Sequence, residues 1–74
     1  MVYPDIARRM GWQGKVIVTF VLENDGQARD VRIHASSGYA ALDSSALRAV
    51  ERAAPLPRAG ETVHIVMPIV FALR

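Results

Sequence analysis

Histidines and serines are the residues of this sequence whose chemistry could serve a reaction or a metal. The histidines are His34 and His64, and four serines form the pairs Ser36-Ser37 and Ser44-Ser45. A metal site needs three or four converging ligands, but the chain has no cysteine and no carboxylate at obvious ligand spacing from either histidine. No nucleophile elbow or glycine-rich anion loop surrounds the serines. We therefore expect exposed histidines, serines that form turns, no enzymatic activity, and no cofactor or metal.

Composition limits the remaining function classes. The 74 residues allow one small domain, residues 1–74, which is too small to enclose a water-excluding pocket easily. Hydrophobic residues make up 51% and charged residues 22%, which is typical of a soluble globular domain. The net charge is only +2 and the arginines are scattered, so we expect no nucleic-acid partner. No signal peptide is recognisable, so any membrane anchor is expected outside this sequence.

Two helices are predicted. Residues 3–11 form the first, with Pro4 at the first helical position and Gly11 as the terminator. The second opens near Asp43, whose carboxylate can cap free amides of the first turn, and Pro55 closes it. The predicted apolar faces consist of Ile6, Ala7 and Met10 in the first helix and Ala46, Leu47, Val50, Ala53 and Ala54 in the second.

Three strands are predicted from alternating apolar residues. Residues 14–23 form the first, and the turn formers Asn24-Asp25-Gly26 return the chain as the second arm of a hairpin. Residues 62–73 form the last strand. The predicted inward-facing residues are Val16, Val18, Phe20 and Leu22, then Val31, Ile33 and Ala35, and finally Val63, Ile65, Met67, Ile69, Phe71 and Leu73.

These elements predict an α+β fold, a two-layer sandwich in which a three-stranded antiparallel sheet carries two helices on one face in the order α-β-β-α-β. The first strand is central, so the last strand lies at an edge and offers unpaired N–H and C=O groups to another strand. Pro68 fits such an edge if its nitrogen faces away from the paired neighbour, and a bulge is the alternative. The opposite sheet face is apolar, which favours a partner or self-association, although an ordinary sheet face remains the alternative. Its apolar residues are Ile17, Val21, Val66 and Val70.

The order and spacing of several short motifs resemble the C-terminal domain of the TonB family of energy transducers almost from end to end. The matching positions are Tyr3-Pro4, Ala7, Gly11, Gln13-Gly14-Lys15-Val16, Phe20, Asp25-Gly26, Val31, Ser36-Ser37-Gly38, Leu42-Asp43-Ser44-Ser45-Ala46-Leu47, Pro55 and Met67-Pro68-Ile69-Val70-Phe71. One departure follows the second helix: members often carry aromatic residues before the proline, whereas this chain has Arg52-Ala53-Ala54-Pro55.

The resemblance implies a periplasmic domain of a protein anchored in the inner membrane. In the family, an N-terminal region that is missing from this sequence works with ExbB and ExbD. The C-terminal domain engages the Ton box peptide of outer-membrane TonB-dependent receptors, which couples nutrient uptake to the proton-motive force. Strand addition suits this task because it relies on backbone hydrogen bonds and tolerates different partner side chains.

We expect residues 63–71 to be the docking strand, with Pro68 limiting the ladder and residues 12–14 as a flanking contact. The expected partner-binding residues are Val63, His64, Ile65, Val66, Met67, Ile69, Val70, Phe71, Trp12, Gln13 and Gly14. For Trp12 the alternative is a cover over the end of the core. The alternatives for the domain are a homodimer formed by exchange of the last strand and a TolA-like envelope-integrity domain.

Overall fold

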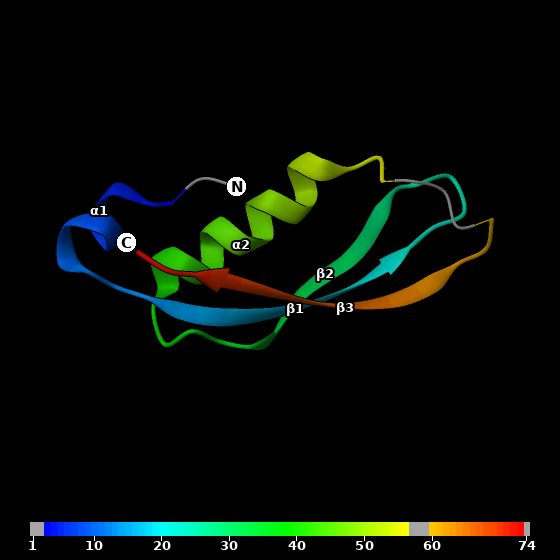
Figure 1. Cartoon of the computed structure of the whole chain (residues 1–74). Coiled ribbons are helices and arrows are strands. Elements are labelled where there is room, and N and C mark those ends of the chain that lie inside the picture. The colour runs from blue at the N-terminus through cyan, green and yellow to red at the C-terminus, as the bar shows by residue number, and fades with distance from the viewer. Residues whose placement is uncertain (1–2, 57–59, 74) are drawn as a thin grey trace.

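The computed structural model describes residues 3–56 and 60–73 and shows a sheet of three antiparallel strands with the order β2-β1-β3. The elements are α1 (Asp5–Met10), β1 (Gly14–Leu22), β2 (Ala28–Ala35), α2 (Ala40–Ala53) and β3 (Val63–Phe71). Helix α2 lies along one face of the sheet, while α1 lies at one end, next to α2 (Figure 1). The predicted α+β architecture and the order of its elements are confirmed. The molecule is elongated, with extents of 41 × 19 × 18 Å.

The core lies between β1 and α2. Alternate residues of β1 are buried, as predicted, because β1 has a strand on each side and a helix over one face. The buried cluster consists of Ala7, Val16, Val18, Phe20, Leu22, Leu42, Ala46, Val50 and Phe71. In β2 the predicted alternation also holds, since Val31, Ile33 and Ala35 are half-buried and their neighbours are exposed. The central strand therefore organises the packing of the domain.

The β1–β2 turn is joined to the segment that follows α2. The Leu56 N–H donates to the Gly26 carbonyl at 2.6 Å. Gly26 has a φ of +93°, and a Cβ at this position would lie 2.4 Å from the Leu56 carbonyl oxygen. Only glycine satisfies both the left-handed backbone and this close approach. The contact holds Leu56 beside the sheet.

Helix α1 differs from its prediction in length and in its apolar face. Pro4 is the residue before the helix rather than its first residue, whereas Gly11 terminates it with a φ of +71°, as predicted. Ile6 and Met10 are 51% and 61% exposed, so only Ala7 faces the core. A helix of 6 residues at the end of the sheet has few neighbours against which a wider apolar face could pack.

Helix α2 begins at Ala40, so Asp43 lies inside the first turn and the prediction that it caps the helix was wrong. The Asp43 carboxylate instead accepts hydrogen bonds from the loop before the helix. The Ser37 N–H and hydroxyl donate to Oδ1 at 3.0 and 2.8 Å, and the Ser36 hydroxyl donates to Oδ2. Burial raises the pKa of Asp43, but these hydrogen bonds outweigh it and hold the pKa below its ordinary value. The end of β2 is thereby fastened to α2.

Candidate docking edge

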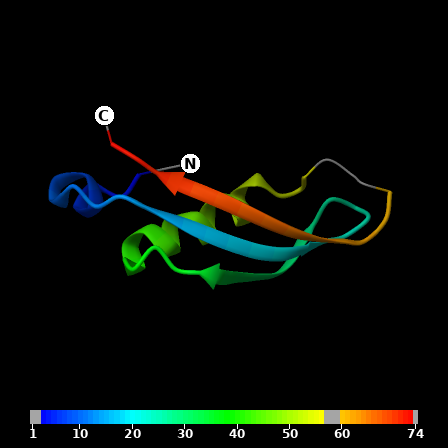
Figure 2. The same cartoon turned by 60° about the horizontal axis from the view of Figure 1, so that its bottom comes forward.

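Strand β3 is an edge strand with one partner. It pairs with β1 in unbroken register over nine residue pairs, from Gly14↔Phe71 to Leu22↔Val63. Strand β2 lies on the far side of β1, and Figure 2 shows β3 at the margin of the sheet. Within residues 3–56 and 60–73, no other strand pairs with the outer flank of β3. A regular row of main-chain groups is therefore available there.

Pro68 indicates which main-chain groups face outward. In an antiparallel pair, residues whose N–H and C=O point toward the partner alternate with residues whose groups point away. Pro68 lies opposite Ile17 and has no N–H, so it fits the position that points away. Leu73 is an odd number of residues from Pro68, so its N–H should point the other way, toward β1. It does so, since it donates to the Gln13 side chain, on the β1 side, at 3.0 Å. It follows that His64, Val66 and Val70 offer outward N–H and C=O groups, while Pro68 offers only a carbonyl.

The face of the sheet away from α2 carries exposed apolar residues next to this edge. Val66 and Val70 are 65% and 63% exposed, as the sequence predicted. Val21 differs, because it is only 9% exposed. Its strand partners are Arg29 and His64, whose longer side chains stand beside it on the same face. The apolar surface is therefore concentrated on β3.

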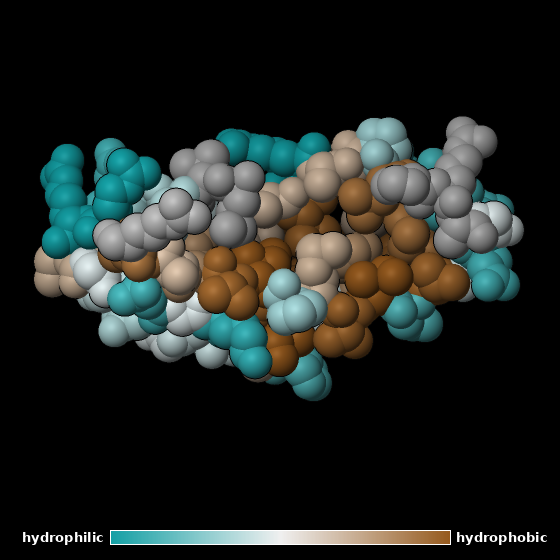
Figure 3. Space-filling model, in the orientation of Figure 1, coloured by the Kyte–Doolittle hydropathy of each residue, from teal (hydrophilic) through white to brown (hydrophobic). Residues whose placement is uncertain are grey.

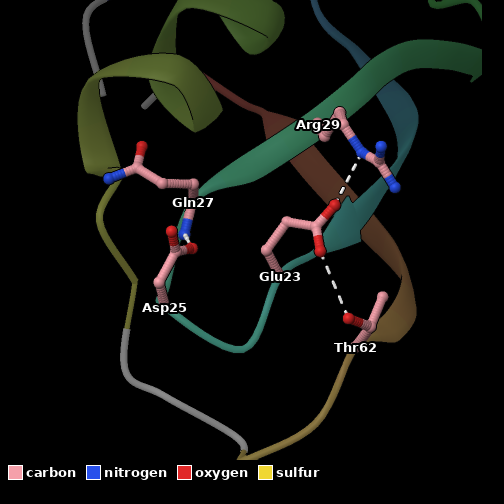
Figure 4. A network of polar contacts seen from close by, with 5 residues as sticks. All are labelled: Glu23, Asp25, Gln27, Arg29 and Thr62. Atoms are coloured by element: carbon pink, nitrogen blue, oxygen red, sulfur yellow. Dashed lines mark hydrogen bonds and ion pairs between the residues drawn. The ribbon is translucent and has the colours of Figure 1, made fainter.

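A polar network fixes the sheet end at which β3 begins (Figure 4). The Glu23 carboxylate accepts a hydrogen bond from the Thr62 hydroxyl at 3.2 Å and pairs with Arg29 Nε at 2.6 Å. Nearby, the Gln27 N–H donates to Asp25 Oδ1 at 3.0 Å within the hairpin turn. Exposed ion pairs contribute only about 0–1 kcal/mol, so the network aligns the three strands more than it stabilises them.

Aromatic residues fix the end at which β3 finishes. Phe71 is 1% exposed and contacts Tyr3 edge to face, with ring centroids 5.4 Å apart. The Tyr3 hydroxyl donates to the Trp12 carbonyl, and the Trp12 ring stacks on Tyr39 at 4.7 Å. Both ends of β3 are thus held by contacts that leave its outer flank free.

The predicted flanking residues lie at the carboxyl end of β3, where Gly14 pairs with Phe71. Trp12 is half-buried against the core, as its alternative role predicted, whereas Gln13 is exposed and binds the Leu73 amide. Gly14 opens β1 and packs on the loop after β2, where an added Cβ would lie 3.0 Å from the Cβ of Ser37. The structure therefore brings all three close to the end of β3, with different degrees of exposure.

Groups suited to catalysis or metal binding are not brought together in the part of the chain that the structure describes. His34 and His64 are exposed on different strands, and no three His, Cys, Asp or Glu residues gather there. A hollow of about 600 Å³ borders the outer side of α2. Its lining consists of Pro4, Ala41, Ser44, Ser45, Arg48, Ala49, Arg52 and Ala53, a set without an acid or histidine. Across residues 3–56 and 60–73, no helix is long and apolar enough to cross a membrane.

The fold and the edge define a class: small two-layer α+β domains whose last strand has one neighbour and a free flank. Residues 1–73 match the family described as "Gram-negative bacterial TonB protein C-terminal". The chain belongs to this family, which confirms the resemblance seen in the sequence.

Relatives and solved structures agree with this assignment. "Protein TonB" of Helicobacter pylori strain J99 is 37% identical over 97% of this chain and 26% of its own length. "Protein TonB" of Pasteurella multocida is 43% identical over 96% of this chain and 28% of its own length. The solution structure of the H. pylori TonB C-terminal domain superposes with a TM-score of 0.88 at 35% identity, covering 99% of this chain and 69% of that one. The C-terminal domain of HasB superposes with a TM-score of 0.61 at 36% identity, covering 97% and 60%. The chain spans about a quarter of the length of the two curated relatives.

Proposed function

We propose that this domain captures the Ton box of outer-membrane transporters by accepting it as a fourth strand beside β3. The free, regular flank of β3 is the observation that carries the proposal. A strand added there would use the outward groups of His64, Val66, Pro68 and Val70. Trp12, Gln13 and Gly14 would contact the peptide where it passes the end of β3.

The number of outward groups sets the expected affinity. Three N–H donors and four carbonyl acceptors allow up to about seven hydrogen bonds, each with a net contribution of about 0.5–1.5 kcal/mol. Ordering of the peptide subtracts from this sum, so we expect weak to moderate binding. Because backbone groups supply most of the attraction, transporters with different sequences can be bound by the same edge.

The wider role proposed for the protein is that of an energy transducer rather than an enzyme. Family membership and the greater length of the TonB relatives support a protein in which residues 1–74 form one periplasmic domain. In that protein, a region outside this sequence would anchor the chain in the inner membrane and contact ExbB and ExbD. The domain would then pass work drawn from the proton-motive force to a bound transporter.

A titration of the ¹⁵N-labelled domain with Ton box peptides tests the capture. We expect the amide signals of His64, Val66 and Val70 to shift most, because their N–H groups face the added strand, while β2 signals move little. The control is the same peptide with alternate residues replaced by proline, which removes the N–H groups that would pair with β3. Shifts confined to β2, or none at millimolar peptide, would refute the proposal.

The same edge supports a second candidate, a homodimer. Val66 and Val70 are exposed beside the free flank, so a second copy could cover both features at once. Sedimentation at several protein concentrations would detect such a dimer. Edge-to-edge pairing of two copies and peptide capture would compete for one surface, so added Ton box peptide should dissociate such a dimer.

A further inference from the structure

The helical layer leaves part of β3 uncovered. Helix α2 packs over β1 and β2 rather than over β3. The residues of β3 on the helix side, Ile65, Met67 and Ile69, are consequently only half-buried. Figure 3 shows apolar residues along this side of the molecule, between α2 and β3. A step therefore exists between the flank of the helix and the edge strand.

A hollow of about 220 Å³ occupies this step. Its lining comes from three segments and consists of Ala49, Val50, Ala53, Leu56, Met67 and Ile69. Ala49 and Ala53 lie one helical turn apart, so their small side chains leave room beside the helix. Every lining side chain is uncharged and apolar, so the hollow suits an aliphatic group and would penalise a buried charge.

The walls are fixed before any ligand arrives. Val50 is 3% exposed and belongs to the core. Leu56 is held by its 2.6 Å hydrogen bond to the Gly26 carbonyl, and β3 is held by its full ladder to β1. A pre-formed apolar hollow binds a side chain without the cost of ordering its own walls.

The hollow lies on the same side of the sheet as the residues of a docked strand that would stand beside Met67 and Ile69. Residues opposite one another on neighbouring strands project to the same face. Since Met67 and Ile69 face α2, a residue of the added strand opposite either of them also faces α2. Its side chain then reaches the hollow, while its two neighbours in the peptide project to the open face, beside Val66 and Pro68 if it lies opposite Met67, or beside Pro68 and Val70 if it lies opposite Ile69.

We propose that this hollow receives one large aliphatic side chain of the docked strand, so that it selects the peptide sequence at a single position. The inference rests on the proposed strand capture and adds a specificity determinant to it. A cavity of about 150 Å³ holds benzene, so the larger hollow admits a leucine-sized group. The remaining peptide positions are then held mainly through the backbone.

A positional scan of a bound Ton box peptide tests this on the unmodified domain. Each residue is replaced in turn by Leu, Ala and Asp, and Kd is measured by calorimetry. At one position we expect Ala to bind about tenfold more weakly than Leu, since a buried aliphatic side chain gains that much from leaving water, and Asp to bind more weakly still. The two adjacent positions should tolerate all three residues.

A variant and a spectroscopic signal locate the selected position. Ala53→Leu fills the hollow from an exposed helix position, and Ala40→Leu makes the same change at an exposed position at the start of α2. Only Ala53→Leu should remove the preference for Leu over Ala. In the unmodified domain, the ¹³C-methyl signal of Met67 should shift with the Leu peptide more than with the Ala peptide, while that of Met10 stays constant.

The outcomes distinguish this inference from the function on which it rests. If no peptide binds, strand capture itself fails and the inference fails with it. If peptides shift the β3 amides but the scan is flat and Met67 is unmoved, capture stands and the inference is overturned. It is also overturned if the scan is flat and Ala53→Leu changes only self-association, because a second copy then occupies the hollow.

Discussion

The two edges of the sheet are built differently. Strand β2 has two register shifts against β1, and Asp30 adopts a φ of +53°, which is unusual for a residue other than glycine. It also alternates half-buried residues with exposed charged ones, and α2 packs over it. Strand β3 has nine pairs in unbroken register and exposes valines instead.

This difference indicates which edge is suited to pair. Bulges, charges and covering elements are the means by which proteins prevent unwanted pairing at sheet edges. Strand β2 combines the first two, whereas β3 has only Pro68 against extended pairing. A strand from a partner would therefore meet a distorted edge at β2 and a regular edge at β3.

Removing the side chain that holds the regular edge in place should have the largest effect. Phe71 is 1% exposed, and Phe71→Ala should destabilise the fold by about 3–5 kcal/mol through loss of burial and a cavity. Val70→Ala, at a neighbouring position that is 63% exposed, should change stability far less. Urea denaturation of the two variants measures the difference. Equal midpoints would show that the end of β3 is not anchored in the core.

Removing one outward donor should weaken capture without unfolding the sheet. Val66→Pro deletes an N–H that faces the added strand, and the presence of Pro68 two residues away shows that an outward position accepts proline. Loss of the hydrogen bond and distortion of the ladder should weaken Ton box binding about tenfold. Val66→Thr keeps the N–H and should bind normally by calorimetry. Unchanged binding by Val66→Pro would contradict docking at the β3 edge and favour docking at the β2 edge.

Restoring a donor should make the open edge more adhesive. Pro68→Val supplies the one outward N–H that β3 lacks, which should strengthen peptide binding by about two- to tenfold, the worth of one hydrogen bond. Self-association should rise as well, because the ladder then runs uninterrupted. Calorimetry and sedimentation measure the two effects. No change in either would mean that Pro68 does not limit pairing.

The smallest effect on stability is expected from Asp43, whose hydrogen bonds to Ser37 join the end of β2 to α2. The pKa of Asp43 is lower in the folded domain than its ordinary value of 3.8, so its contribution to stability is present above that value and is lost as pH falls through the folded pKa. Asp43→Asn should lower the urea midpoint slightly at neutral pH. The gap between variant and wild type should close below about pH 4. A gap independent of pH would contradict this origin.

Much of the fold follows from local patterns. Alternation identified the inward residues of β1 and β2, because their period of two matches a strand with one buried face. The turn formers before Gln27 and the proline after α2 marked the ends of elements correctly. The apolar first strand predicted a central β1 and hence β3 at an edge, a position that Pro68 also fits.

Other features depend on contacts between distant segments and left no local signal. Asp43 has the residue type of a helix cap, but Ser36 and Ser37 compete for its carboxylate. Ile6 and Met10 have helical spacing, yet α1 lies at the end of the sheet. The hollow depends on which strands α2 covers, and spacing along one segment cannot reveal that.

The contact between Tyr3 and Phe71 has a mechanical consequence. Tension applied at Tyr3 reaches the sheet at the end where β3 finishes and β1 begins, through the ring contact with Phe71 and along the chain itself. A strand lying along β3 and pulled away from that point is loaded lengthwise, so its hydrogen bonds share the load in shear and must break together. A Ton box captured as proposed would then withstand a brief pull better than its affinity implies.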